Sequence, residues 1–466
     1  MKIKLDKFII CPIIIFSCLY LPFLNIIPYL DGNIDFVQVF DYQQGGFVQY
    51  FQRWGSVHPP LKLIISKLLI DLIGEKIIAY ELLGYLFGII GIVTIYFLSH
   101  RMFNRNVARI SSLLLASSPM YISNGIFSLR DYLLTCLILA SLTCLAYQKY
   151  SLYAVLVTFA FLSKESAILL ILCSLLAELI FLSRRTRLNE LFYHFLPLFA
   201  SFGWWQFLKI NHQKSWSDWI FAETASKGTY YTMINNILTL KIFNQYAYQH
   251  WLQLFFLNFN WFFWLIFALG LVMFLWNSFY REKIFRHFLE RTYLAKTATT
   301  VALFSVSYFL TVLCFQTYTI PRYILPLIPF LYMAVSFFLG KQMEKNKIIA
   351  STVISAITVI VFLSALFSLD PISGKIWGKI KILDQTFYGL SNHLAGNDGI
   401  TYNLQFLLLA KKRNDLILAA NRQKQPVVHS ECRWIFPDPR NDYQTLRILK
   451  LESINLNNPC VYLKNE

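Results

Sequence analysis

The chain has 466 residues, of which 56% are hydrophobic and only 14% are charged, and its mean hydropathy is +0.50. A soluble globular protein rarely combines so many apolar residues with so few charges, so that class is excluded. The formal net charge of +17 could indicate a nucleic-acid partner, but basic residues of membrane proteins gather in cytoplasmic loops, and we expect no nucleic acid.

Apolar runs long enough to cross a bilayer recur along most of the chain and predict an all-α polytopic membrane protein. The first run has no small-residue cleavage site after it, so we expect an uncleaved anchor. About eleven transmembrane helices are predicted, near residues 8–30, 77–99, 107–123, 132–148, 151–163, 166–183, 191–210, 256–279, 297–316, 323–340 and 348–368.

The distribution of Lys and Arg predicts a cytoplasmic N-terminus. With that orientation, the cytoplasmic segments hold eighteen Lys and Arg residues, whereas the much longer outer loops hold ten. Acidic residues show the opposite bias and mark the outer face as the working face. We expect a plasma membrane protein, by default in a bacterial inner membrane.

Residues 1–369 are predicted to form the transmembrane domain, with long outer loops at 31–76 and 211–255. Aromatic residues at helical spacing in the first loop predict short amphipathic helices that lie in the membrane interface. Residues 370–466 are more polar, and we expect a small extracytoplasmic α/β or α+β domain. Cys432 and Cys460 lie in this segment and could form a disulfide there.

The first outer loop opens with an acidic stretch, "DGNIDFVQVF" at 31–40. Asp31 and Asp35 share a face if this piece is helical, and a carboxylate at the mouth of a membrane cavity can act as a general base on an acceptor hydroxyl. The alternative is that both are solvated interfacial acids or caps of the following helix.

Basic residues on the outer side are candidates to hold an anion. Arg130 can bind a phosphate that Asp131 orients, although such residues can also join helices structurally. Lys164 and Arg322 stand where the chain crosses between the outer leaflet and the protein, and either could simply snorkel. His58 precedes two prolines that fix its direction, or that merely start a helix. Together with the acids, these cations suit the transfer of a group from a lipid phosphate to a hydroxyl.

Four segments resemble the GT-C superfamily of membrane glycosyltransferases, in the branch of protein O-mannosyltransferases and lipid A aminoarabinose transferases. An acidic first outer loop precedes "HPPL" at 58–61, and "LLASSPMYISNGIFSLRDYLLT" at 114–135 resembles the third loop of the family. "AFLSKESAILLIL" at 160–172 and "PRYILPLIPFLYM" at 321–333 resemble two later family segments. The resemblance covers roughly residues 1–370, but the acidic pair usual in the first loop of the family is absent here.

The resemblance implies a polyprenyl-phosphate sugar donor, and a protein, lipid or polysaccharide acceptor whose hydroxyl loses its proton to Asp35, with Asp31 as the competing candidate. Membrane lipids would be the surrounding partners. Relatives differ in their use of a divalent metal; this sequence shows no strong ligand cluster, so we expect none. The residues that would steady the donor phosphate are Arg130, Lys164, His58 and Arg322, with Asp131 and Tyr323 in support.

Other functions share some of these features. A transporter or flippase of lipid-linked sugars would have similar spans and basic inner loops, but it would place polar residues at the membrane midplane and often show internal repeats. A non-catalytic membrane scaffold would tolerate replacement of the outer acids. A polysaccharide polymerase or ligase would share the donor chemistry but not the pattern of the first loop. We therefore favour a glycosyltransferase.

Overall fold

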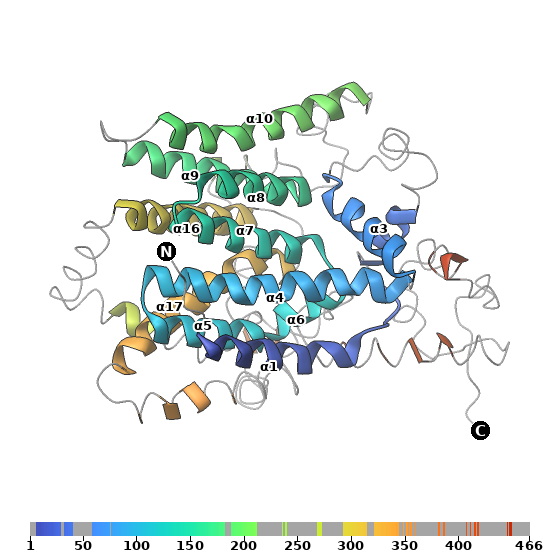
Figure 1. Ribbon diagram of the computed structural model, residues 1–466, viewed down its shortest axis with the longest axis horizontal. Helices are drawn as coiled ribbons and strands as arrows, with labels where there is room; N and C mark the ends of the chain where they lie inside the picture. The colour runs from blue at the N-terminus through green and yellow to red at the C-terminus, as the bar shows by residue number, and fades with distance from the viewer. Residues whose placement is uncertain are drawn as a thin grey trace.

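The computed structural model describes residues 6–28, 32–40, 58–74, 76–181, 188–211, 268–272, 292–314 and 321–343, with scattered single residues and pairs elsewhere. Within these ranges the chain is mostly helical (Figure 1). The described strands are two-residue pieces, β1 (Lys381–Ile382) and β2 (Gln385–Thr386), which pair antiparallel.

From α3 to α10, the described α-helices follow one another with short connections. They are α1 (Ile10–Tyr20), α3 (Leu61–Ile73), α4 (Lys76–Met102), α5 (Arg105–Ala116), α6 (Pro119–Ile126), α7 (Arg130–Ala146), α8 (Tyr150–Ser163), α9 (Ile168–Ile180), α10 (Leu188–Asn211), α16 (Thr292–Cys314) and α17 (Ile328–Met343). Residues 32–40 are also helical. Short 3₁₀ turns are η1 (Lys7–Ile9), η2 (Leu21–Phe23), η3 (Glu165–Ala167) and η6 (Pro321–Leu327).

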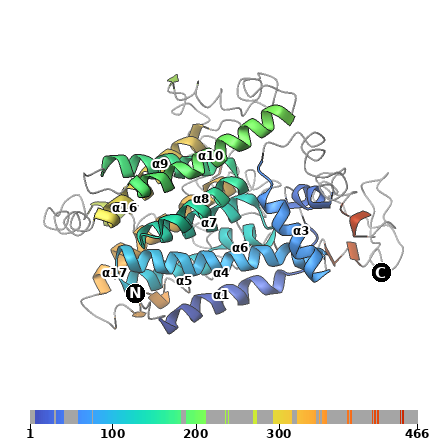
Figure 2. The ribbon, with the colours of Figure 1, turned by 45° about the horizontal axis from the view of Figure 1, so that its top comes forward.

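The long helices lie side by side, and α7 is at the centre of the bundle (Figures 1 and 2). Helix α7 packs between α4 and α8, while α9 and α10 pack against each other and α16 packs on α9. Nearly every residue of α7 is buried, because its sequence is apolar on all sides. The polar exceptions at its first turn, Arg130 and Asp131, are therefore held inside the protein.

Three of the described helices are long and apolar enough to cross a membrane: Lys76–Met102, Tyr293–Val312 and Arg322–Gly340. A fourth span results if Met120–Ile126 and Arg130–Ala146, which meet at 116°, are taken together. The chain therefore has several apolar helices, as the sequence predicts. The predicted spans 256–279 and 348–368 lie largely outside the described residues, and the total of about eleven stays a prediction.

Two predicted spans differ from the structure. The span expected at 107–123 is broken, because the Ser118 hydroxyl caps a new helix, α6, that has a proline at its start. The helix expected over 8–30 ends at Phe23. Beyond it, the carboxylate of Glu81 accepts hydrogen bonds from the backbone N–H groups of Asn25 and Ile26, and Asn25 has a φ of 70°.

Helix α4 approaches the α6–α7 turn at a glycine. A Cβ atom on Gly84 would lie 1.9 Å from the carbonyl oxygen of Gly125, so no larger residue fits without movement of one backbone. The Tyr20 hydroxyl donates to the carbonyl oxygens of Glu81 (2.9 Å) and Gly125 (2.8 Å) and ties α1 to the same place. This contact fixes the start of α7 against α4.

Several C-terminal residues contact the end of the bundle at which α3 lies (Figure 1). Asn414 accepts a hydrogen bond from the Ile27 N–H (3.2 Å), and Lys76 Nζ donates to the Ile448 carbonyl (2.6 Å). Thr445 hydrogen-bonds Asn33, two residues before Asp35. The predicted topology places the first outer loop and the C-terminal segment on one side of the membrane, and the same segments meet here.

Helices occur at 32–40 and in α3 within the first outer loop, where short helices are predicted. Their position in a membrane interface stays a prediction. The predicted outer loop at 211–255, the fold of the domain 370–466, and Cys432 and Cys460 lie largely or wholly outside the described residues.

Candidate functional site

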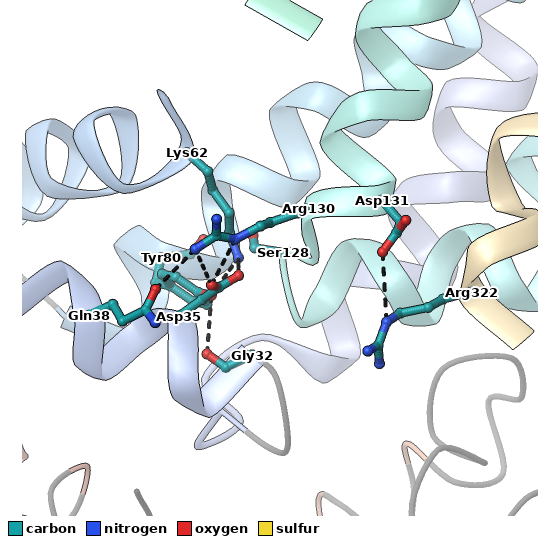
Figure 3. A network of polar contacts seen from close by, with 9 residues as sticks. All are labelled: Gly32, Asp35, Gln38, Lys62, Tyr80, Ser128, Arg130, Asp131 and Arg322. Carbon is teal, nitrogen blue, oxygen red and sulfur yellow. Dashed lines mark hydrogen bonds and ion pairs between the residues drawn. The ribbon is translucent and has the colours of Figure 1, made fainter. Parts of the chain in front are cut away.

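Asp35 occupies the centre of a buried polar group (Figure 3). The helix over residues 32–40 presents this side chain between α3 and the start of α7, and the residue is 6% exposed. Its Oδ2 accepts a hydrogen bond from Lys62 Nζ at 2.5 Å. Its Oδ1 accepts from Nε (2.9 Å) and Nη2 (2.7 Å) of Arg130. The predicted base is therefore clamped between two cations.

Lys62 enters the site from the first turn of α3. The preceding prolines lack N–H groups, and Pro60 caps the helix with its backbone carbonyl bonded to the Ile64 N–H. The ammonium of Lys62 is fully buried and also donates to the Tyr80 hydroxyl at 2.9 Å. Tyr80 in turn donates to the Gly32 carbonyl at 3.1 Å, so α3, α4 and helix 32–40 are joined through one lysine.

Arg130 is positioned by a tight turn between α6 and α7. Ser128 has a φ of +46°, in the left-handed region that residues with side chains seldom adopt. Its hydroxyl donates to the Tyr80 carbonyl at 2.9 Å, which attaches the turn to α4. Arg130 then reaches across to Asp35 and to the side-chain oxygen of Gln38 (3.0 Å). The strained turn thus sets the direction in which α7 starts.

The two cations keep Asp35 ionised. Burial raises the pKa of the Asp35 carboxyl. The charges of Arg130 and Lys62 and their hydrogen bonds lower it by more than burial raises it, so the net pKa lies well below the usual range. A carboxylate has about four lone-pair sites, so Asp35 can accept one more hydrogen bond, from an acceptor hydroxyl.

A second polar group begins at the next residue of α7. Asp131 accepts a hydrogen bond from Lys164 Nζ at 2.5 Å and lies 3.7 Å from Arg322 Nε. The ammonium of Lys164 lies 4.6 Å from the centre of the Tyr323 ring. Burial lowers the pKa of Lys164, but Asp131, Tyr323 and Glu165 together raise it by more, and the net pKa is raised. Figure 3 shows Asp131 directed away from Asp35 and toward Arg322.

His58 forms the third part of the site. Its Nδ1 lies 2.8 Å from a carboxylate oxygen of Glu165, the residue after Lys164. Burial raises the pKa of Glu165, but the charge and hydrogen bond of His58 lower it to about 2. Because 40% of the His58 side chain is exposed, this pair is the open edge of the site.

Adjacent residues link the three parts: Arg130 with Asp131, and Lys164 with Glu165. Together the parts carry an excess of positive charge. Among the described residues, four permanent cations face three carboxylates, so one positive charge remains before the ionisation of His58 is counted. The cations are Lys62, Arg130, Lys164 and Arg322; the carboxylates are Asp35, Asp131 and Glu165. A buried site with this net positive charge can hold a phosphate anion beside an ionised carboxylate.

The sequence-based interpretation differs from the structure in its pairings. Arg130 does not face Asp131 but binds Asp35, and Asp131 instead binds Lys164 and Arg322. Asp31, the competing candidate for the base, lies outside the described residues. The structure brings together Asp35 and Arg130 in one group, and Lys164, Arg322, Tyr323 and Asp131 in another, with His58 beside them on Glu165.

Four residues of the site were not predicted from the sequence: Lys62, Tyr80, Gln38 and Glu165. Lys62 lies in an apolar helix, "LKLIISKLLI", where a lysine is usually a solvated or snorkelling residue. The available signal was the spacing to His58, four residues earlier, although Pro59 and Pro60 between them are not helical. Among the described residues, no group of three or more His, Cys, Asp or Glu side chains lies close enough to hold a metal ion.

Residues 57–205, which contain most of this site, match the family model described as dolichyl-phosphate-mannose-protein mannosyltransferase. This segment, about a third of the chain, is therefore similar to that family, and the match confirms the resemblance to the mannosyltransferase branch. No curated protein sequence matches the chain.

Solved structures with similar folds include ArnT from Cupriavidus metallidurans bound to undecaprenyl phosphate, at 14% identity and a TM-score of 0.48, over 97% of this chain and 76% of that one. Another is the archaeal oligosaccharyltransferase AglB from Archaeoglobus fulgidus in complex with an inhibitory peptide and a dolichol-phosphate. Its identity is 11% and its TM-score 0.48, over 90% of this chain and 57% of that one.

Proposed function

We propose that the chain is an integral membrane glycosyltransferase that moves a sugar from a polyprenyl-phosphate donor to an acceptor hydroxyl on the extracytoplasmic face. The observation that carries this proposal is the buried Asp35 carboxylate, held by Lys62 and Arg130 beside a further pair of cations. The family match over 57–205 supports the same reaction class.

In the proposed reaction, the acceptor hydroxyl gives its proton to Asp35 as its oxygen attacks the anomeric carbon of the sugar. The bond between that carbon and the phosphate oxygen breaks, and the lipid phosphate leaves with the electron pair. Negative charge therefore develops on the leaving oxygen. Arg130, Lys164 and Arg322 supply positive charge to this oxygen, and fixed cations in a site shielded from water are an effective way to stabilise it.

The proposed location follows from the same features. The polyprenyl donor is a membrane lipid, and the site lies near the ends of α3, α7 and α8, where the first predicted outer loop meets the bundle. The distribution of basic residues supports a cytoplasmic N-terminus and an extracytoplasmic site. We place the protein in a bacterial plasma membrane, with a protein, lipid or polysaccharide as acceptor.

The test is a transfer assay with purified protein in detergent and a panel of radiolabelled polyprenyl-phosphate sugars. Asp35→Asn should reduce turnover by about 10²–10⁴-fold, because the amide cannot take the proton of the acceptor. Asp71→Asn is the matched control, since Asp71 is another acid of the first outer loop, 56% exposed and paired with Lys67 on the same helix. It should transfer like the wild type.

Equal turnover in the Asp35→Asn and wild-type proteins would remove Asp35 from the role of base. If the wild type transferred no sugar from any donor, yet carried the labelled lipid between the leaflets of a vesicle, the chain would be a transporter. In that case the glycosyltransferase proposal would fail.

A further inference from the structure

We infer that Lys62 is the positioning residue of the site: it holds and orients the Asp35 carboxylate throughout the reaction, so that Arg130 is left to serve the donor phosphate. This inference rests on the proposed function. The two cations contact different oxygens of the same carboxylate, Lys62 at Oδ2 and Arg130 at Oδ1. The residues around each cation indicate that Lys62 and Arg130 have different roles.

The surroundings of Lys62 bind it to the protein frame. The side chain has no exposed surface, and its ammonium contacts both Asp35 and the Tyr80 hydroxyl. The same ammonium lies 5.1 Å from the centre of the Tyr80 ring. Tyr80 is itself fully buried and hydrogen-bonded to the Gly32 carbonyl. The described residues enclose this ammonium, and its contacts preserve the direction of Asp35.

Arg130 is placed differently. It stands at the first residue of α7, directly before Asp131, which binds Lys164 and lies 3.7 Å from Arg322. The guanidinium carries several donors in a planar fork, so it can bind a carboxylate and a phosphate at once or exchange one for the other. Figure 3 shows the Lys62 and Arg130 side chains meeting at Asp35, and Arg322 beside Asp131, the residue that follows Arg130.

This division of roles has a consequence for the pH dependence of transfer. Among the described residues, the charged groups that contact Asp35 are Lys62 from α3 and Arg130 from α7. From α4, Tyr80 contacts Lys62, and Glu81 accepts hydrogen bonds from backbone N–H groups of residues 25 and 26. Removal of Lys62 leaves the burial of Asp35 opposed by one cation, so the pKa of its carboxyl rises. Because the base acts only when ionised, the acidic limb of the rate profile moves to higher pH.

The experiment measures kcat and the donor KM from about pH 4 to pH 8 for the wild type, Lys62→Met and Lys62→Arg. Lys62→Met should lower kcat by about tenfold or more, leave the donor KM within about twofold, and bring the acidic limb up into this pH range, below which it lies in the wild type. Lys62→Arg keeps the charge and should keep the limb of the wild type. Lys67→Met, on the same helix and paired with the exposed Asp71, is the control and should change neither.

The inference fails if Lys62→Met raises the donor KM while kcat and the pH profile stay as in the wild type, because Lys62 would then bind the phosphate. It also fails if Lys62→Arg and Lys62→Met behave alike. Should Lys62→Met not fold, Tyr80→Phe removes the second hydrogen bond of the ammonium, and it should lower kcat without raising the donor KM. A raised donor KM in Tyr80→Phe would overturn the inference. Absence of transfer by the wild type would instead reject the proposed function itself.

Discussion

Two groups of buried charges lie near opposite ends of the same helices. The outer group contains Asp35 and its cations and continues to Lys164, directly after the end of α8. The inner group is defined by Glu178, Glu190, His194 and Lys296, and it lies near the start of α8, where the Tyr153 ring contacts the His194 ring at 5.0 Å between centroids. Both groups contain an ion pair of lysine and carboxylate at 2.5 Å.

The groups differ in their balance of charge. In the inner group, Lys296 lies 2.5 Å from Glu178 and 3.7 Å from Glu190, so one lysine faces two carboxylates. His194 lies 3.7 Å from Glu178. The outer group has the opposite sign, with more cations than carboxylates. A buried ion pair alone therefore does not mark a phosphate site; of the two groups, the outer one has the sign of charge that attracts a phosphate.

Among the changes that compare the two groups, the largest expected effect comes from removal of the Arg130 guanidinium from the outer group. Arg130→Ala should reduce kcat/KM for the donor by about a hundredfold, because two to three charge-assisted hydrogen bonds are lost. Arg105→Ala is the matched control, since Arg105 pairs with Asp6 near the predicted cytoplasmic end and its side chain is 57% exposed. If both variants transferred at the same rate, the phosphate role of Arg130 would be wrong.

A different kind of effect is expected from the inner group. Lys296→Met leaves Glu178, which is 1% exposed, without its cation and should cost about 3–5 kcal/mol of stability. Thermal unfolding in detergent would show a lower Tm, while transfer per folded molecule stays unchanged. The double variant Glu178→Gln/Lys296→Met should recover most of the loss. Reduced transfer at an unchanged Tm would give the inner group a functional role, and the two groups would then not differ in function.

The smallest effect is expected at the edge of the outer group. The His58 side chain is 40% exposed in its pair with Glu165, and exposed ion pairs contribute little. His58→Ala should therefore raise the donor KM by about threefold, as measured in the same transfer assay. A loss as large as that of Arg130→Ala would mean that the imidazole takes part directly in the reaction.

Much of the helical fold follows from the sequence. The spans predicted at 132–148, 151–163 and 191–210 correspond to helices at 130–146, 150–163 and 188–211, because long apolar runs leave few alternatives. The break before α6 was missed, since Pro119 and the serine that caps the helix lie within one apolar run. Such a run looks continuous by composition, but the proline cannot donate the backbone hydrogen bond needed to continue α5.

The site could be predicted only in part. Asp35 and Arg130 stand out as charges beside apolar helices, but they are 95 residues apart, and their pairing depends on the packing of α7 beside helix 32–40. Lys62 could not be recognised, because nothing in its local sequence distinguishes a buried lysine from a snorkelling one. Only the position of Tyr80 on the next helix shows that its ammonium points inward.

The most direct test of the central claim is the binding of polyprenyl phosphate to the wild type, Arg130→Ala and Lys296→Met proteins at one fixed salt concentration. We expect saturable binding by the wild type, affinity weaker by about tenfold or more for Arg130→Ala, and unchanged affinity for Lys296→Met. Equal affinity of the Arg130→Ala and wild-type proteins, or an equal loss in both variants, would contradict the assignment of the outer group as the phosphate site.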